Sequence, residues 1–153
     1  MEPIERVKKF LAEQDVKLEV IEFPEGATET CDLAAQALGV EPAQIAKSLL
    51  FIGKNTNVLV VTCGDEKVDT KKLKQYFGGK FRFARSEEVE EITGFPPGGV
   101  CPFALKEEIP IVLDKSLARF PVVYTAAGNS GSAVPVTLEQ LLTITKGECL
   151  DVC

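Results

Sequence analysis

The 153-residue chain contains no histidine. Without an imidazole, Ser-His-Asp and Cys-His catalysis, histidine acid–base chemistry and most zinc sites are excluded. An enzyme with this sequence must use lysine, carboxylates, hydroxyls, thiols, backbone amides or groups of its own substrate.

Cysteine residues are scattered along the chain and form no paired motif. The five cysteines are Cys31, Cys63, Cys101, Cys149 and Cys153, and none belongs to a C-x-x-C pair. An odd number without paired spacing indicates neither a disulfide framework nor a zinc site. A nucleophilic role for Cys101 is disfavoured, because the chain offers no histidine to activate its thiol.

Long apolar runs are also missing. No stretch approaches the roughly 20 apolar residues of a membrane-spanning helix. The first ten residues, MEPIERVKKF, are typical of an amphipathic helix rather than a signal peptide, so we expect a cytoplasmic protein. The formal net charge of -6 repels nucleic acid, so a nucleic-acid partner would need a local basic surface.

The composition, 45% hydrophobic and 26% charged, is that of a soluble globular protein, and we expect residues 1–153 to form one domain. Hydrophobic spacing and turn residues predict α-helices and strands in alternation. The expected helices cover 3–14, 31–38, 70–76, 87–93 and 138–144, with single turns at 42–46 and 115–119. The expected strands cover 17–23, 48–52, 57–63, 81–84, 111–114, 122–125 and 134–136. This pattern predicts a compact α+β domain with a mixed, mostly antiparallel central sheet of about six or seven strands flanked by helices.

Several local signals fix these boundaries. Thr30, Asp69, Ser86 and Thr137 are each expected to cap the helix that follows. Gly39 is expected to end its helix in the left-handed conformation. The strand at 134–136 should lie at a sheet edge, because proline cannot donate a ladder hydrogen bond. The turn residues at 53–56 predict a hairpin between two strands that are buried on both faces.

Lys47 lies where the chain enters the apolar strand at 48–52. A charged side chain is rarely buried without a partner, so this ammonium must reach water or face a cleft. Two loops rich in small residues could face it, at 94–102 and at 128–131.

Three blocks of the sequence carry a family resemblance. They are TCDLAAQALGVEPAQIAKSLLF at 30–51, GFPPGGVCPFAL at 94–105, and residues 114–141, where VYTAAGNSGSAVPVTLEQLL follows the strand. Together they resemble the YbaK/ProX family of free-standing aminoacyl-tRNA deacylases, whose domain is also inserted in some prolyl-tRNA synthetases. The resemblance implies that family's fold and a hydrolase that cleaves the ester of mischarged tRNA without a metal or cofactor.

The resemblance also implies partners and site residues. The substrate would be tRNA-Pro carrying a wrong small amino acid (Cys, Ala, Ser or Thr), and a prolyl-tRNA synthetase is a possible partner. Lys47 would be the family's essential lysine, while Gly98, Gly99, Val100 and the loop at Gly128 would line the pocket for the aminoacylated 3′ end. Ala126 and Ala133 stand where cysteine-specific members have a serine and an aspartate, and the histidine of alanine-specific members is absent, so the amino acid removed stays open.

Chemistry suggests roles for these groups. Lys47 can act by charge, which we favour, or as a general base if burial lowers its pKa. Backbone amides of the glycine loops can stabilise the developing oxyanion. Further candidate contacts to the substrate are Thr30, Ser48, Asn129 and Ser130.

Lys71, Lys72 and Lys74 belong to the one basic concentration in this acidic chain. They are either a solvated helix face or contacts to the tRNA backbone. Two other functions fit the same features: a non-hydrolytic tRNA- or nucleotide-binding regulatory protein, and a hydrolase of a small-molecule ester or thioester.

Overall fold

The computed structural model describes residues 1–153. The α-helices are α1 (Pro3–Ala12), α2 (Cys31–Leu38), α3 (Thr70–Phe77), α4 (Ser86–Thr93) and α5 (Leu138–Thr145), and the 3-10 turns are η1 (Pro42–Gln44) and η2 (Lys115–Arg119). The strands are β1 (Ile21–Glu22), β2 (Ala46–Gly53), β3 (Val58–Cys63), β4 (Phe81–Phe83), β5 (Ile111–Asp114), β6 (Val123–Thr125), β7 (Ser132–Val136) and β8 (Glu148–Leu150). None of the helices has both the length and the apolar character needed to cross a membrane.

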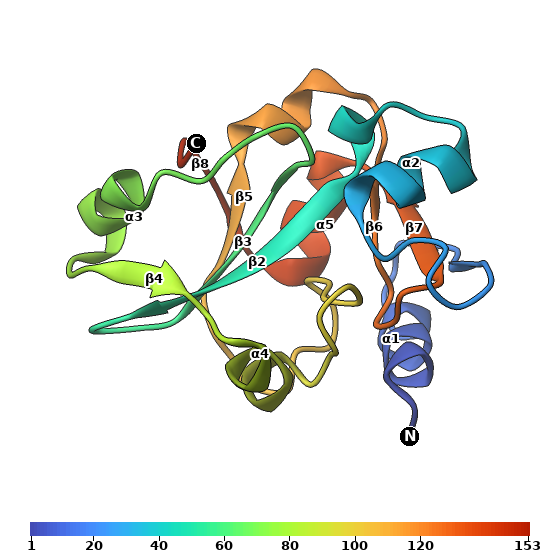
Figure 1. Cartoon of the computed structure of the whole chain (residues 1–153), viewed down its shortest axis with the longest axis horizontal. Helices are drawn as coiled ribbons and strands as arrows, with labels where there is room; N and C mark the ends of the chain where they lie inside the picture. The colour runs from blue at the N-terminus through green and yellow to red at the C-terminus, as the bar shows by residue number, and fades with distance from the viewer.

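The strands form two sheets that lie side by side (Figure 1). The larger sheet is mixed, with strand order β4-β2-β3-β5-β8, and the smaller is antiparallel, with order β1-β7-β6. A single parallel bridge between Ile45 and Tyr124 connects them. The mixed α+β class is therefore confirmed. The strands form two sheets instead of the one expected, because β6 pairs with the segment before β2 only through the Ile45–Tyr124 bridge.

Local hydrogen bonds explain the helix starts. The side chains of Thr30, Asp69 and Thr137 accept hydrogen bonds from backbone N–H groups in the first turns of α2, α3 and α5, which confirms these three caps. The expected cap at Ser86 was wrong by one residue. Ser86 already lies in α4, and the carboxylate of Glu88 accepts a hydrogen bond from the Arg85 N–H at 2.8 Å.

The hairpin of β2 and β3 is confirmed, and it forms the centre of the larger sheet. Every residue of β3 is buried, as expected for a strand covered on both faces. In contrast, β2 is only partly buried. Gly39 ends α2 with φ 71° and ψ 34°, the expected left-handed cap.

Three strands differ from the sequence expectation. The strand predicted at 17–23 pairs only at Ile21 and Glu22, which lie opposite Ala133 and Ser132 of β7. The edge position predicted for 134–136 was wrong: β1 pairs with one side of β7 and β6 with the other, so β7 is the middle strand of its sheet. Pro135 is tolerated there because β1 does not extend to its level. Strand β8 is short and partly polar, and no sequence signal indicated it.

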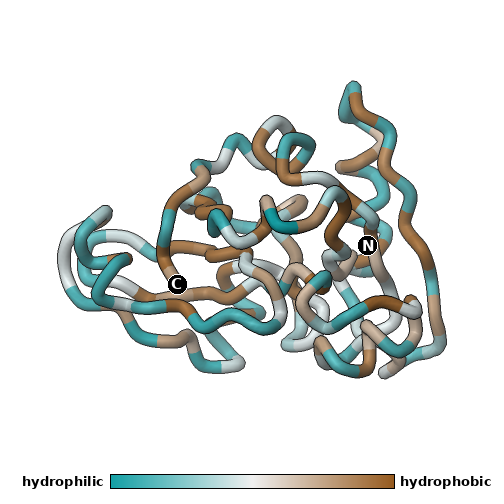
Figure 2. The backbone as a smooth tube through the Cα atoms, turned by 90° about the horizontal axis from the view of Figure 1, so that it is seen from above, coloured by the Kyte–Doolittle hydropathy of each residue, from teal (hydrophilic) through white to brown (hydrophobic).

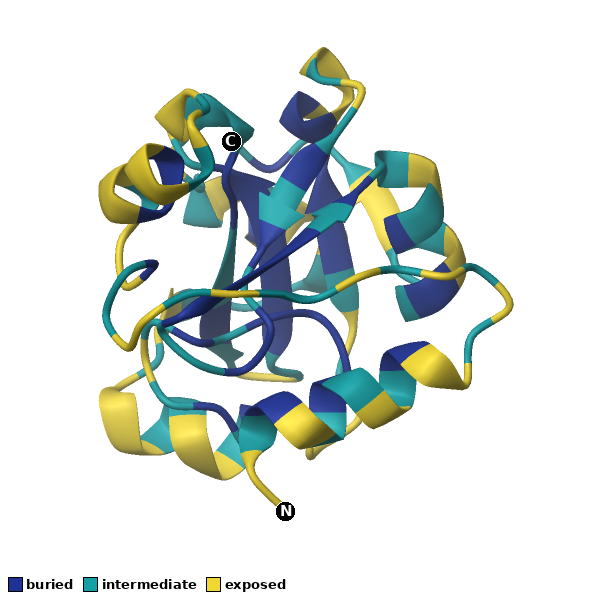
Figure 3. Cartoon of the chain, turned by 90° about the vertical axis from the view of Figure 1, so that its right-hand side faces the viewer, coloured by how far each residue is buried: buried dark blue, intermediate teal, exposed yellow.

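Buried side chains cover both faces of the larger sheet. On one face Val61 and Leu113 pack in the main cluster with residues of α1, α5 and the smaller sheet. On the other face Val58 and Val60 pack against Leu73 of α3. Figure 2 shows hydrophobic segments along the central strands, and Figure 3 shows buried strands at the centre, between helices that carry exposed residues. The packing fixes both ends of β2, which carries Lys47.

Candidate active site

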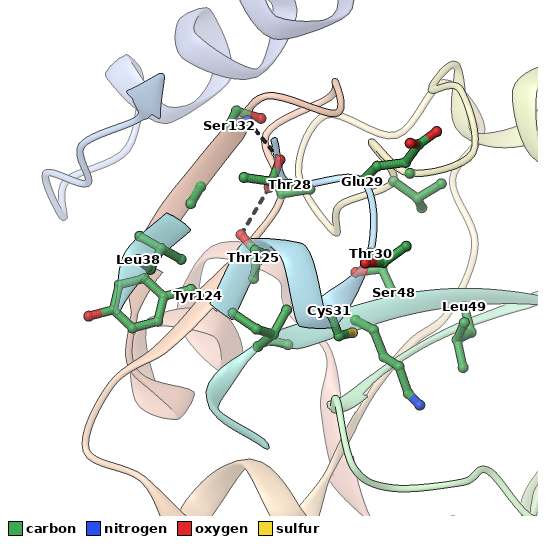
Figure 4. Close-up of a pocket in the computed structure, with 18 residues that line it drawn as sticks. Thr28, Glu29, Thr30, Cys31, Leu38, Ser48, Leu49, Tyr124, Thr125 and Ser132 are labelled. Carbon is green, nitrogen blue, oxygen red and sulfur yellow. Dashed lines mark hydrogen bonds between the residues drawn. The ribbon is translucent and has the colours of Figure 1, made fainter. Parts of the chain in front are cut away.

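A cavity of about 270 Å³ lies where the two sheets meet. Its walls come from the segment before α2 and α2 itself, the start of β2, the loop at 98–100, and strands β6 and β7. Figure 4 shows Thr28, Glu29 and Thr30 on the first of these segments, Ser48 and Leu49 on β2, and Tyr124 and Thr125 on β6. The cavity thus gathers parts of all three blocks noted in the sequence.

Lys47 lies on β2 opposite Thr62 of β3 and lines this cavity. Its ammonium donates to the carbonyl oxygen of Glu66 at 2.6 Å and to that of Gly64 at 3.4 Å. A lysine ammonium has three N–H donors and no acceptor. The loop after β3 therefore holds the charge in place and leaves one donor for another partner.

Two ionisable groups near Lys47, Cys31 and Asp65, have shifted pKa values that fix their charge states. Burial raises the pKa of the Cys31 thiol, although the Lys47 ammonium acts in the opposite direction. Cys31 is therefore a neutral thiol in the cavity wall. The hydrogen bond from Arg119 lowers the pKa of Asp65, with a smaller contribution from Lys47, so this carboxylate stays ionised within the loop whose carbonyls hold the ammonium.

The two glycine loops have different positions. Gly98 and Val100 line the cavity, whereas Gly99 and Gly128 do not. The Gly128 N–H donates to the Gly99 carbonyl at 3.0 Å, and a Cβ on Gly99 would come within 2.7 Å of backbone atoms of Gly128 and Asn129. The loops pack directly on one another, so Gly99 and Gly128 support the wall that Gly98 and Val100 form.

We expect Gly99→Ala to lower both stability and any activity of this cavity. Real Cβ atoms do not approach backbone atoms to 2.7 Å, so the added methyl must separate the two loops. Overpacking of this kind costs about 1–3 kcal/mol. Urea denaturation measures the loss, and an unchanged free energy of unfolding in Gly99→Ala would contradict the packing role.

Asn129 and Ser130 also lie outside the cavity wall. The Ser130 hydroxyl oxygen accepts from the Gly26 N–H at 3.1 Å, and its carbonyl accepts from the Thr28 N–H at 2.8 Å. The Asn129 side chain accepts from the Gly131 N–H. These bonds hold the segment that carries Thr30 against the smaller sheet. Their contact with a substrate stays a prediction.

The sequence interpretation missed several cavity residues, including Thr28, Cys31, Tyr124 and Thr125. The polar ones in the inner wall are already paired. Ser132 donates from its backbone to Thr28 Oγ1 at 3.0 Å, and the Thr125 hydroxyl donates to the Ala126 carbonyl at 3.0 Å. The other inner wall residues are small or apolar: Ala34, Leu38, Ile45, Ala126 and Ala133. This interior suits a small side chain.

Other candidate groups can be placed as well. Cys101 is fully buried, and burial raises the pKa of its thiol to about 12, so it is not an activated nucleophile. No three cysteine or carboxylate side chains gather as ligands of a metal ion would.

The basic helix α3 lies at the far end of β2 from the cavity (Figure 1). Lys71 and Lys74 are exposed on it. Lys72 is engaged, because its ammonium donates to Asp151 at 3.1 Å and to the Cys153 carbonyl at 2.5 Å.

Comparison with known proteins gives a consistent result. The family model described as "Aminoacyl-tRNA editing domain" matches residues 25–144, which include the whole cavity. The uncharacterized protein YwhH of Bacillus subtilis (strain 168) is 39% identical over 152 residues, which cover 98% of this chain and 96% of YwhH. The "Putative Cys-tRNA(Pro)/Cys-tRNA(Cys) deacylase EbsC" of Enterococcus faecalis is 27% identical over 125 residues, which cover 80% of this chain and 76% of that protein.

Longer proteins and solved structures also match. A proline–tRNA ligase of Bacillus licheniformis is 38% identical over 103 residues, which cover 67% of this chain but only 18% of the ligase. The crystal structure of "a putative trans-editing enzyme for prolyl tRNA synthetase" superimposes with a TM-score of 0.92 at 35% identity, covering 99% of this chain and 97% of that one.

Proposed function

The chain belongs to the aminoacyl-tRNA editing domain family, and from this premise we propose that it hydrolyses the ester of mischarged tRNA in trans. The observation that carries the proposal is the position of Lys47. One cation, held by two carbonyl oxygens, lines a cavity with small inner side chains in the part of the chain that matches the family.

The chemistry needs little more than this. An aminoacyl ester is already activated, and a thousand- to ten-thousand-fold acceleration lowers the barrier by only about 4–5.5 kcal/mol. Oriented donors at a developing oxyanion supply about 3–4 kcal/mol, and positioning of the ester supplies the rest. We assign Lys47 the role of a fixed charge for the ester carbonyl or the terminal phosphate, with water or a group of the substrate as nucleophile.

We further propose that the substrate is tRNA-Pro charged with a small non-cognate amino acid. The support is the small inner wall around Ala126 and Ala133, together with relatives that are proline–tRNA ligases or are named as deacylases of Cys-tRNA(Pro). A synthetase partner is a natural extension, because the ligases carry a matching stretch within their own chains. Such a substrate would place the activity in the cytoplasm.

The direct test uses tRNA-Pro charged with Ala, Cys, Ser, Thr or Pro. We expect the protein to release at least one of the first four amino acids faster than proline. Binding without release of any amino acid would instead favour a non-hydrolytic regulatory protein. Hydrolysis of small esters at a rate that tRNA does not affect would favour a small-molecule hydrolase.

The exposed lysines of α3 give a second prediction. We propose that Lys71 and Lys74 contact the tRNA backbone beyond its 3′ end, because both are exposed on α3, which lies at the other end of β2 from the cavity (Figure 1). The double change Lys71→Glu and Lys74→Glu should raise KM with little effect on kcat. It should also reduce the slope of log affinity against log salt concentration by about two.

The matched control is a charge reversal on α1, at the exposed Lys9. It changes the net charge in the same direction but on a helix away from α3 (Figure 1). A KM for the α3 variant that equals that of Lys9→Glu, after allowing for the number of charges, would show that α3 does not contact the tRNA.

A further inference from the structure

The outer edge of β2 is covered at both ends but open at one residue. At its start, the bridge between Ile45 and Tyr124 brings β6 against this edge. At its end, β4 pairs with Phe51, Ile52 and Gly53. Between these two neighbours lies Ser48, in the wall of the cavity.

Strand geometry shows where the backbone of Ser48 points. The Leu50 carbonyl accepts a hydrogen bond from the Ala84 N–H at 3.0 Å, so the backbone polar groups of Leu50 face the outer edge. Backbone groups alternate along an antiparallel strand, so the N–H and C=O of Ser48 face the same way. Neither has a partner among the loop and turn hydrogen bonds, and the strand that pairs along this edge, β4, reaches only Phe51, Ile52 and Gly53.

The side chain of Ser48 is unsatisfied too. Its hydroxyl oxygen is buried and has no hydrogen-bond partner, the one such buried side-chain atom in the protein. A buried polar group left unpaired costs about 1–3 kcal/mol, and most are paired in native proteins. The other hydroxyls of the inner wall, Thr28, Thr125 and Ser132, all have partners. Ser48 thus offers three free polar groups beside Lys47.

We propose that the aminoacyl group of the substrate pairs with Ser48 as one residue of an additional β-strand. In an antiparallel hydrogen-bonded pair, two residues exchange both N–H···O=C bonds. An aminoacyl ester carries an α-ammonium and a carbonyl, the same donor and acceptor as a strand residue. The Ser48 C=O accepts from the α-ammonium and the Ser48 N–H donates to the ester carbonyl. This inference rests on the proposed deacylase function.

The pairing gives Ser48 a part in the reaction. Water attacks the carbonyl carbon, and the carbonyl π electrons move to the oxygen that the Ser48 N–H contacts. Collapse of this oxyanion re-forms the C=O bond and breaks the bond to the ribose oxygen, which takes a proton that originates from the water. The products are the free amino acid and the tRNA 3′ end. Recognition of the main chain in this way is independent of the amino-acid side chain, which is left to the apolar inner wall.

The test removes the N–H alone. Ser48 is replaced by lactic acid, which has the methyl side chain of alanine but an ester oxygen in place of the backbone N–H. The reference variant is Ser48→Ala, which has the same methyl group and keeps the N–H. Loss of one oxyanion donor should lower kcat about 100- to 1,000-fold relative to Ser48→Ala. Ser48→Ala itself should lose only about 3- to 10-fold from its hydroxyl.

Phenyllactic acid at position 83 is the matched control. The backbone N–H of Phe83 faces the open outer edge of β4, since its neighbour Ala84 donates to β2. Each ester replacement also makes the carbonyl of the preceding residue a weaker hydrogen-bond acceptor. These residues, Lys47 and Arg82, both belong to paired strands, so the two variants are matched in this respect. The change at position 83 should leave kcat unchanged, and thermal unfolding should shift equally for both.

Two outcomes would overturn the inference. If the native protein deacylates mischarged tRNA and the lactic acid variant matches Ser48→Ala, the N–H has no role and the proposed function still stands. Calorimetry with a non-hydrolysable 3′-aminoacylamino adenosine tests the pairing without turnover. Equal affinity in the two variants would contradict the pairing even if the native protein hydrolysed nothing, whereas weaker binding by the lactic acid variant would support it.

Discussion

Lys47→Ala is expected to lower kcat for deacylation about 100- to 1,000-fold, the usual effect of removing a preorganised charge from a reacting centre. The ammonium is anchored by the carbonyl oxygens of Gly64 and Glu66 and keeps a donor for the substrate. Single-turnover hydrolysis of mischarged tRNA measures the effect. Lys47→Arg should retain more activity than Lys47→Met, although the planar guanidinium cannot reproduce the position of a point charge.

Lys17→Ala provides the control for this change. Lys17 is exposed, and like Lys47 its ammonium donates to two backbone carbonyls, those of Ala12 and Gln14, both at 3.4 Å. Its removal therefore costs the same kind of contacts outside the cavity. If Lys47→Ala and Lys17→Ala lost activity equally, Lys47 would be a structural residue and the assigned role would fail.

Asp114→Ala should have the largest effect on stability, a loss of about 3 kcal/mol in the free energy of unfolding. The carboxylate of Asp114 is 1% exposed and accepts from the N–H groups of Ser116 and Val152, both at 3.0 Å. Each hydrogen bond to a charged group contributes about 1.5–3 kcal/mol, and its removal leaves buried donors unpaired. Urea denaturation measures the loss, which corresponds to a Tm lower by about 6–12 °C.

The effect should depend on pH in a defined direction. Burial alone raises the pKa of Asp114, but the hydrogen bonds from Ser116 and Val152 outweigh it and hold the pKa below its usual range. The ionised form therefore stabilises the fold above the unfolded pKa of about 3.9. This stability is lost as the pH falls through the lower folded pKa, so the difference between native protein and Asp114→Ala should shrink in acid.

Asp65→Ala is the control, because the carboxylate of Asp65 is exposed and its pair with Arg119 contributes less than about 1 kcal/mol.

The sequence predicted best what depends on neighbouring residues. The caps at Thr30, Asp69 and Thr137 were found because a side-chain oxygen reaches a backbone N–H two or three residues ahead. The start of α4 was misplaced by one residue, because the carboxylate of Glu88, rather than the hydroxyl of Ser86, bonds to the backbone at the N-terminus of the helix. Such signals need no knowledge of the fold.

Features that depend on distant residues were predicted less well. β7 is a middle strand because β1 pairs with it. That pairing involves only Ser132 and Ala133 of β7, and the alternating pattern at 17–23 does not indicate which strand it pairs with. The position of Lys47 beside a cavity was expected. Thr28 and Tyr124 were missed, because a threonine before a helix and a tyrosine in a strand are common and do not by themselves indicate a site. The open edge at Ser48 requires the positions of β4 and β6, which no local pattern contains.

The cavity walls are joined by contacts between residues that are very far apart along the chain. Gly26 bonds to Ser130, and Thr28 to Ser132, each across 104 positions. Closing such long loops costs entropy before any contact rewards it, and folds rich in non-local contacts form slowly. A nascent chain still lacking β7 would therefore have no binding site, and substrate recognition should arise only in the final stage of folding.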